Sequence, residues 1–169
     1  MRRLTLFLIS FLTWWLLTWP YDFSSGQMDW QSFALGIFAA GLVSLLFVSI
    51  FTKSPHKLFI LKRYLWFLYY IPVFFYYCVK ANLDVVYRVL HPKMPINPGI
   101  VKVRTKLKSE SAITALCNSI TLTPGTLSVD LTDDGYIYIH WINVTSQDTK
   151  KATEEIVTKF EKILERIFE

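Results

Sequence analysis

Residues 31–52 read QSFALGIFAAGLVSLLFVSIFT, which is twenty-two residues in a row without a charged side chain. A helix that crosses a membrane needs about 20 predominantly apolar residues, within a range of about 17–25. This stretch therefore predicts a transmembrane helix. It is the strongest candidate span in the chain.

A shorter charge-free run precedes it, from Leu4 to Trp19, and reaches Tyr21 if interfacial aromatic residues are included. The alternative is a cleaved signal peptide, because Arg2 and Arg3 precede the run. Tryptophans crowd its end, however, and no small-residue cleavage site follows. We therefore expect residues 1–57 to hold a membrane α-helical hairpin, with helices at about 4–21 and 31–52.

The charges next to these runs predict an orientation. Acidic residues lie in the 20–30 turn, and the basic residues Lys53, Lys57, Lys62 and Arg63 follow the second run. The positive-inside rule then places the N-terminus and the 53–63 loop in the cytoplasm. The net charge is +6 up to Ile96 and −1 beyond it, so the basic excess flanks membrane segments and does not indicate a nucleic-acid partner.

A third apolar run, Tyr64 to Val79, contains Pro72 and several tyrosines, and both of its flanks are basic. These features favour an interfacial helix over residues 58–90, lying in the cytoplasmic surface of the bilayer. The alternative is a third span. Two spans leave the C-terminal domain in the cytoplasm, whereas three would place it outside.

A linker rich in proline, residues 91–99, leads into a predicted cytoplasmic α+β domain at 100–169. The domain begins with strict alternation, which predicts a half-buried strand. One face of this strand carries Val101, Val103, Thr105 and Leu107, and the other carries Lys102, Arg104, Lys106 and Lys108.

The remaining elements follow from caps, turns and periodicity. Ser109 can cap a helix running to about Thr121. The apolar residues at 127, 129 and 131 alternate with polar ones in a second strand, and Asp133–Gly135 turns into a third strand at 136–144. A final helix is expected at 146–168, with Glu155 and Lys159 paired outside its buried stripe. The order β-α-β-β-α predicts a small sandwich of one sheet with two helices on one face.

Residues suited to chemistry are sparse. Neither predicted span contains an ionisable residue, which argues against a stand-alone channel or antiporter. Asp84 is spaced to pair with Lys80 and Arg88, and His140 has no second ligand nearby. Cys78 and Cys117 share no motif spacing and are interpreted as small buried hydrophobes. We therefore predict no enzyme activity, cofactor or metal site.

Two patterns predict contacts instead. A stripe of small residues runs down the second span, which lets another helix approach closely; the partner is either the first span or another protein. The basic row of the first strand is a solvated face or a contact for lipid headgroups or an acidic partner. The stripe is Ser32, Gly36, Ala40 and Ser44, and the row is Lys102, Arg104, Lys106 and Lys108.

Three segments resemble a known family. They are NPGIVKVRTKLK at 97–108, NSITLTPGT at 118–126 and IHWINV at 139–144. Together they resemble the E-type subunit of the Mrp-type (MnhE family) multisubunit Na⁺/H⁺ antiporters. Related subunits occur in archaeal membrane-bound hydrogenases and sulfur reductases.

The resemblance implies a non-catalytic accessory subunit, needed for assembly or stability while larger subunits carry the ions. Its partners would be other membrane subunits and the lipid bilayer of the cell membrane. The alternative is the equivalent subunit of a hydrogenase- or sulfur-reductase-type complex. A second alternative, from a different class, is a membrane-anchored module that docks a cytoplasmic partner through its basic strand face.

Overall fold

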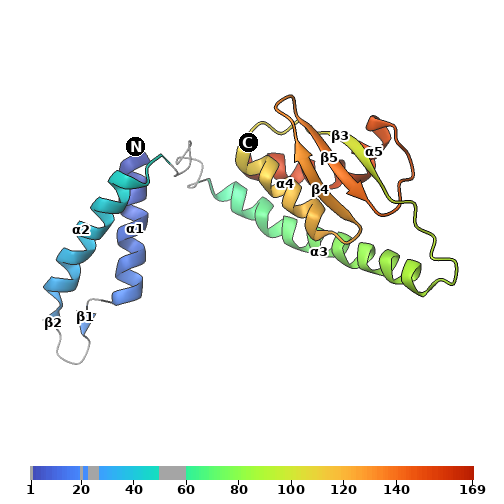
Figure 1. The fold of residues 1–169 in the computed structure, drawn as a ribbon. Helices are drawn as coiled ribbons and strands as arrows, with labels where there is room; N and C mark the ends of the chain where they lie inside the picture. Colours follow the sequence, from blue (N-terminus) through green and yellow to red (C-terminus); the bar gives the residue numbers. More distant parts are fainter. Residues whose placement is uncertain (1, 20, 23–26, 50–59) are drawn as a thin grey trace. The chain divides into compact units, whose positions relative to one another are not determined.

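The computed structural model describes residues 2–19, 21–22, 27–49 and 60–169. They belong to two compact units, Met1–Ile60 and Leu61–Glu169 (Figure 1). The expected end of the second span at 50–52 and the flanking Lys53 and Lys57 lie outside the described residues. Within the described residues, no helix is both long enough and apolar enough to cross a membrane.

The first unit is a helical hairpin. Helix α1 (Arg2–Thr18) and helix α2 (Trp30–Leu46) are joined through a short antiparallel pair of strands, β1 (Tyr21–Asp22) and β2 (Gln27–Met28). Asp29 caps α2, because its carboxylate accepts hydrogen bonds from the first backbone N–H groups of the helix. Each helix has 17 residues, or about 26 Å at a rise of 1.5 Å per residue.

The second unit is an α+β domain preceded by a long helix, and the expected order β-α-β-β-α is present. The helices are α3 (Leu61–Leu90), α4 (Glu110–Leu122), α5 (Thr149–Ile156) and α6 (Thr158–Phe168). The strands β3 (Gly99–Arg104), β4 (Thr126–Leu131) and β5 (Tyr136–Trp141) form an antiparallel sheet in the order β3-β5-β4.

The core of this unit lies between one face of the sheet and the helices. Val101, Val103, Thr105 and Leu107 are buried while the lysines and Arg104 between them are exposed, so the predicted alternation is confirmed. Strand β5 adds Ile137 and Ile139, α4 adds Leu116 and Ile120, and α6 adds Phe160 and Leu164.

Local signals set the boundaries of α4 and the two turns. The Ser109 hydroxyl accepts a hydrogen bond from the Ala112 N–H and so caps α4, as predicted. Gly125 and Gly135 have φ values of +89° and +81°, a left-handed conformation that favours glycine. They allow the sharp turns before β4 and between β4 and β5.

Two elements differ from the sequence prediction. The expected final helix is two helices, α5 and α6, which meet at Val157. There the Thr158 hydroxyl donates to the Thr153 carbonyl, an interaction that competes with regular helical bonding.

Strand β4 also departs from simple alternation. Its register with β5 shifts by one residue between Ser128 and Asp130, which leaves Val129 as the extra residue of a β-bulge. Ser128 faces the helices, where its hydroxyl donates to the Cys117 carbonyl. Leu127 and Val129 are exposed on the opposite side. The apolar set of this strand therefore does not line the core.

Helix α3 lies along the domain (Figure 1). One stripe of its surface packs on the core cluster of the second unit, through Trp66, Tyr70, Phe74 and Tyr77. The other sides of the helix are exposed.

Candidate functional site

The small-residue stripe of α2 packs against α1. Gly36, Ala40 and Ser44 are buried, and a methyl group at Gly36 would overlap the Trp14 ring. The Trp14 indole Nε1–H donates to the Ser32 carbonyl oxygen at 3.0 Å. In this single chain the stripe contacts the first helix.

The basic row of the first strand is divided in two. Lys102 and Arg104 lie on β3 and point to the outer side of the sheet, whereas Lys106 and Lys108 follow the end of the strand. The backbone N–H groups of these last two residues donate to carboxylates of Glu161 and Glu169. Only half of the predicted row is therefore part of the sheet surface.

The two cations on β3 lie beside aromatic rings of β5. Lys102 Nζ is 3.8 Å from the centroid of the Tyr136 ring and 5.9 Å from that of Tyr138. The Arg104 guanidinium carbon is 5.4 Å from the Tyr136 centroid. Cation–π contacts of this kind hold the positive groups close to the sheet surface.

The aromatic stripe of α3 meets Phe160, a fully buried residue of α6. Its ring centroid is 6.3 Å from that of Tyr70, 6.2 Å from that of Phe74 and 5.6 Å from that of Tyr77. The Tyr70 hydroxyl also shares a short hydrogen bond with the Ser119 hydroxyl of α4. The sequence pattern does not predict this contact between α3 and the domain core, although Trp66, Tyr70, Phe74 and Tyr77 follow helical spacing.

Lys159 is half-buried between α3 and α6, closer to the core than the predicted pair with Glu155 implied, although Glu155 still interacts with it electrostatically. Its Nζ is 5.2 Å from the Tyr77 ring centroid and 5.1 Å from that of Phe160. Burial lowers the pKa of Lys159, an effect that Glu155 opposes and Lys80 reinforces. Glu155 also accepts a hydrogen bond from the Thr145 hydroxyl.

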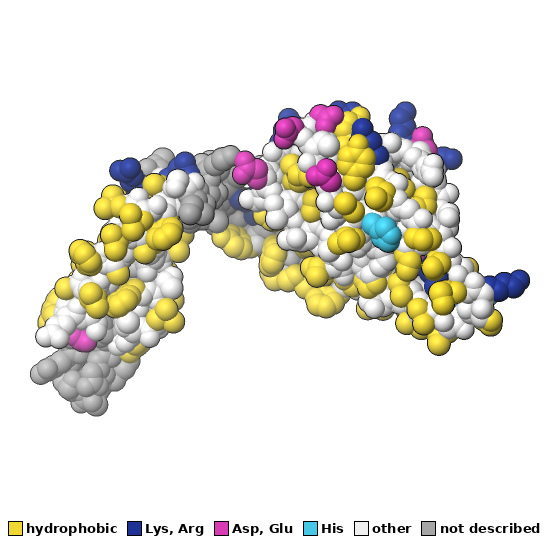
Figure 2. All heavy atoms as spheres, in the orientation of Figure 1, with side chains coloured by type: hydrophobic (Ala, Val, Ile, Leu, Met, Phe, Trp, Pro, Cys, Tyr) yellow, Lys and Arg dark blue, Asp and Glu magenta, His cyan; other side chains and the backbone are white. Residues whose placement is uncertain are grey.

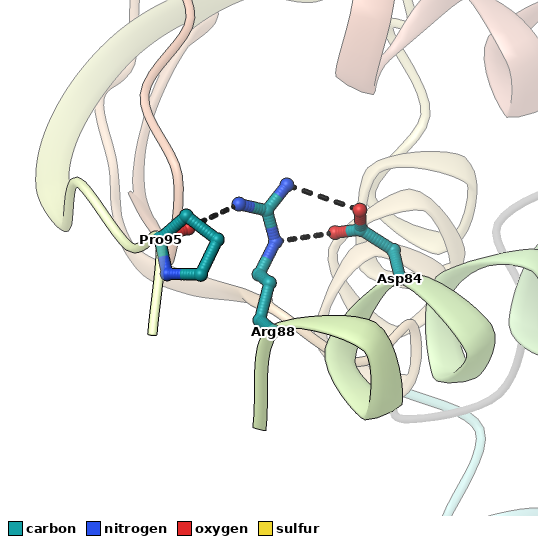
Figure 3. Close-up of polar contacts among 3 residues, drawn as sticks. All are labelled: Asp84, Arg88 and Pro95. Carbon is teal, nitrogen blue, oxygen red and sulfur yellow. Dashed lines mark hydrogen bonds and ion pairs between the residues drawn. The ribbon is translucent and has the colours of Figure 1, made fainter. Parts of the chain in front are cut away.

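Figure 3 shows how Arg88 fastens the end of α3 to the linker. Its Nε and Nη2 donate to the two carboxylate oxygens of Asp84, at 2.7 and 3.0 Å. Its Nη1 donates to the Pro95 carbonyl oxygen at 2.6 Å. The predicted i,i+4 pair of Asp84 is thus formed with Arg88, and its bond to the linker is an addition that spacing did not reveal.

Residues suited to catalysis do not converge in the described part of the chain. It contains no group of three His, Cys, Asp or Glu residues placed to hold a metal. Cys78 and Cys117 are free and partly buried, and burial raises the pKa of the Cys117 thiol. His140 is exposed on β5. What the geometry offers is surface for contact.

Exposed apolar side chains mark these contact surfaces (Figure 2). They cover α1 and α2, the outer side of α3 between residues 64 and 79, and the side of the sheet away from the helices. Clusters of exposed apolar side chains are typical of contact with a membrane or with another protein.

Comparison with known proteins identifies the family. The family profile described as MNHE, a Na⁺/H⁺ ion antiporter subunit, matches residues 7–167. The chain belongs to this family. The resemblance to the E-type antiporter component inferred from residues 97–108, 118–126 and 139–144 is therefore confirmed.

Individual relatives support the same family assignment. The E-type Na⁺/H⁺ antiporter subunit of Alkalihalophilus pseudofirmus is 44% identical over 118 residues, which are 63% of this chain and 73% of the relative. The corresponding E-type subunit of Bacillus subtilis is 35% identical over 156 residues, which cover 89% of this chain and 92% of the relative.

A solved structure resembles this MNHE-family chain over nearly its whole length. It is a chain of the membrane-bound sulfane sulfur reductase, an archaeal respiratory membrane complex. The sequences are 42% identical, the TM-score is 0.74, and the match covers 99% of each chain. The chain is thus similar both to antiporter subunits and to a chain of a sulfur reductase complex.

Proposed function

We propose that this chain is a non-catalytic accessory subunit of an Mrp-type multisubunit cation/proton antiporter. It supports assembly or stability, while other subunits carry the ions. The match of the antiporter-subunit family over residues 7–167 carries this proposal. The surfaces described above suit it, because they offer contacts rather than a path for ions.

A second candidate is the equivalent subunit of a membrane-bound sulfur reductase or hydrogenase-type complex. One observation favours it, namely the 42% identity to the sulfane sulfur reductase chain over 99% of both chains. The subunits that co-purify separate the two candidates. Iron–sulfur subunits would support the second, and their absence beside large multispan subunits would support the first.

We place the α1–α2 hairpin in the membrane. Large apolar side chains such as Leu17, Leu35 and Phe38 point away from its seam, and a helical hairpin satisfies its backbone groups internally, as lipid requires. The charge-free sequence also continues beyond α2 to Thr52.

We place α3 in the bilayer interface. Its inner stripe is occupied by the domain through Tyr70, Phe74 and Tyr77, while exposed apolar side chains fill its outer side from Tyr64 to Val79. Basic residues stand at both ends of this charge-free stretch, Lys62 and Arg63 before it and Lys80 after it. Aromatic and apolar residues flanked by lysine and arginine suit a helix lying in the headgroup region.

In this arrangement the N-terminus and the α+β domain face the cytoplasm. A cysteine at position 134, in the turn between β4 and β5, tests the placement in a background with Cys78 and Cys117 replaced by serine. The Asp134→Cys variant should resist an impermeant thiol reagent in whole cells and react after the membrane is opened. Labelling in intact cells would contradict a cytoplasmic domain.

Purification of the tagged full-length chain in mild detergent tests the accessory function. Large multispan subunits should co-purify, and deletion of the chain should lower the amount of assembled complex. Recovery of a lone chain, together with full ion transport in its absence, would show that the proposal is wrong.

A further inference from the structure

The outer sheet face is the side of the three-stranded sheet that the helices leave uncovered. It carries apolar side chains where a solvated antiparallel sheet ordinarily carries polar ones. Ile100 is 61% exposed, Leu127 is 49% exposed and Val129 is 54% exposed. Figure 2 shows hydrophobic side chains gathered around a histidine on this part of the surface.

Strand register orders these residues into rows across the sheet. Ile100 and Leu127 are both paired with His140, so one row across the sheet has aliphatic side chains on β3 and β4 with a histidine between them on β5. The next row joins Lys102, Tyr138 and Asp130. The outer sheet face is thus apolar at one end and charged towards the other.

The bulge in β4 sets the row next to these residues. Before it, the strand alternates: Leu127 is exposed and Ser128 faces α4, where its hydroxyl donates to the Cys117 carbonyl. The extra residue, Val129, is also exposed and moves Asp130 into register with Tyr138. Bulges change the direction in which the following side chains point. Leu127 and Val129 therefore expose aliphatic surface directly beside the charged row that contains Asp130.

The charged end has cations available to a partner. Lys102 and Arg104 lie against the Tyr136 ring. The pKa of Asp134 in the adjoining turn is lowered by a hydrogen bond from Thr132 and, further, by these two cations, but among the described residues neither cation forms a direct ion pair with a carboxylate. Two cations held on one aromatic ring are suited to receive a carboxylate from outside.

The charged end of the outer sheet face is unfavourable for contact with a lipid surface. Asp130 stands in the middle row, and Asp133 and Asp134 occupy the adjoining turn, so anionic headgroups would meet three carboxylates. Helix α3 offers a separate apolar surface flanked only by basic residues at its charge-free stretch. A protein segment can position one apolar side chain and one carboxylate at separate points of the outer sheet face. A bilayer presents a continuous surface and cannot position single groups in this way.

We infer that the outer sheet face docks an amphipathic segment of another subunit of the same complex. Apolar side chains of that segment lie on the row formed by Leu127, His140 and Ile100, and one of its carboxylates pairs with Lys102 and Arg104. The inference rests on the proposed function, because it assumes that the chain is part of a multisubunit complex.

Photo-crosslinking in the purified complex tests the occupant. A benzoylphenylalanine residue replacing Leu127 should crosslink to one other subunit, and the same probe replacing Glu154 on α5 should not reach that subunit. A crosslink only to lipid, a crosslink to a second copy of this chain, or no crosslink would overturn the inference.

Charge reversal tests the electrostatic part. The double variant Lys102→Glu with Arg104→Glu should lower retention of that subunit at least tenfold at moderate salt. Lys150→Glu with Lys151→Glu makes the same change in net charge at exposed positions of α5 and should leave retention unchanged. Equal protease resistance of the α+β domain in both variants confirms that folding is intact.

The two proposals fail in different ways. If the unaltered chain co-purifies with no other subunit, the proposed function itself is wrong. If the unaltered chain co-purifies but the Lys102→Glu and Arg104→Glu variant is retained equally well, the complex is real and the docking surface lies elsewhere.

Discussion

The two units of this chain differ in the residues that they bury. In the first unit Gly36, Ala40 and Ser44, together with Leu6, are buried, and large apolar residues such as Phe38 point outward. In the second unit Phe160 and its neighbours are fully buried, as in a water-soluble core. Membrane helices often pack through small residues and turn large apolar residues outward. Lipid permits this because it is as apolar as those side chains.

Helix α3 combines both patterns. Its inner stripe packs on the core of the second unit through Tyr70, Phe74 and Tyr77. Its outer side exposes large apolar side chains, as the surface of the hairpin does. The bilayer interface proposed above for α3 would lie along this outer side. The predictions below test the contrast between the units, beginning with the largest effect.

Truncation of one phenylalanine in each unit should have very different results. Phe160→Ala removes a fully buried ring from the core of the second unit, and such changes cost about 3–5 kcal/mol. Phe38 is 69% exposed on α2, so Phe38→Ala should change stability little in detergent. Denaturant unfolding of the full chain, followed by hydrogen exchange of β5 and α2, measures both. Similar losses of stability in the two variants would contradict the difference between the units.

Two glycines of the same helix provide a matched pair. A methyl group at Gly36 overlaps the Trp14 ring, whereas one at Gly41 meets nothing within 4 Å. Gly36→Ala should destabilise the hairpin by about 1–3 kcal/mol through overpacking. Gly41→Ala should be neutral or stabilising by up to about 1 kcal/mol, because alanine favours helix. Hydrogen exchange of α1 and α2 amides reports the difference, and equal protection in the two variants would contradict the packing described.

The contact between α3 and the linker should respond to a conservative change. Arg88→Lys retains the charge but loses the two-pronged bond to Asp84 and the bond to Pro95. We expect a loss of about 1 kcal/mol, near the usual value for a hydrogen bond. Faster hydrogen exchange at the Asn97 amide, which bonds the Ile142 carbonyl, is the local measurement. Unchanged exchange there would mean that Arg88 does not hold the linker.

The smallest predicted effect is a change in pH dependence. Burial lowers the pKa of Lys159, so the unfolded chain binds the proton more tightly than the folded one. Stability should therefore rise with pH, from the lowered folded pKa up to the ordinary pKa of a lysine in the unfolded chain. Lys159→Met should remove this rise and stabilise the domain at neutral pH. Lys162→Met, at an exposed position of the same helix, is the control. An unchanged pH slope in Lys159→Met would show that Lys159 is not its source.

Much of the second unit could be predicted from sequence because its signals are local. The alternation from Val101 to Leu107 follows the two-residue repeat of a strand. Ser109 can cap a helix by its own side chain. Gly125 and Gly135 mark turns that other residues rarely make. The family resemblance came from the same region.

Features that depend on tertiary contacts could not be predicted in the same way. Periodicity shows that Leu127 and Val129 share a face but not which face is buried. The bulge that puts Asp130 opposite Tyr138 depends on the pairing with β5, which no local signal reveals. The stripe of α3 has helical spacing, yet nothing local identifies Phe160 as its partner. The break at Val157 likewise contradicts a continuous apolar repeat.

The central claim is that this chain supports assembly and does not itself move ions. Its most direct test is ion transport in vesicles, divided by the amount of assembled complex, for Gly36→Ala, Phe160→Ala and the Lys102→Glu and Arg104→Glu variant. The account predicts that the amount of complex falls while transport per assembled complex stays at the level of the unaltered protein. A variant that assembles fully but transports fewer ions per complex would contradict it.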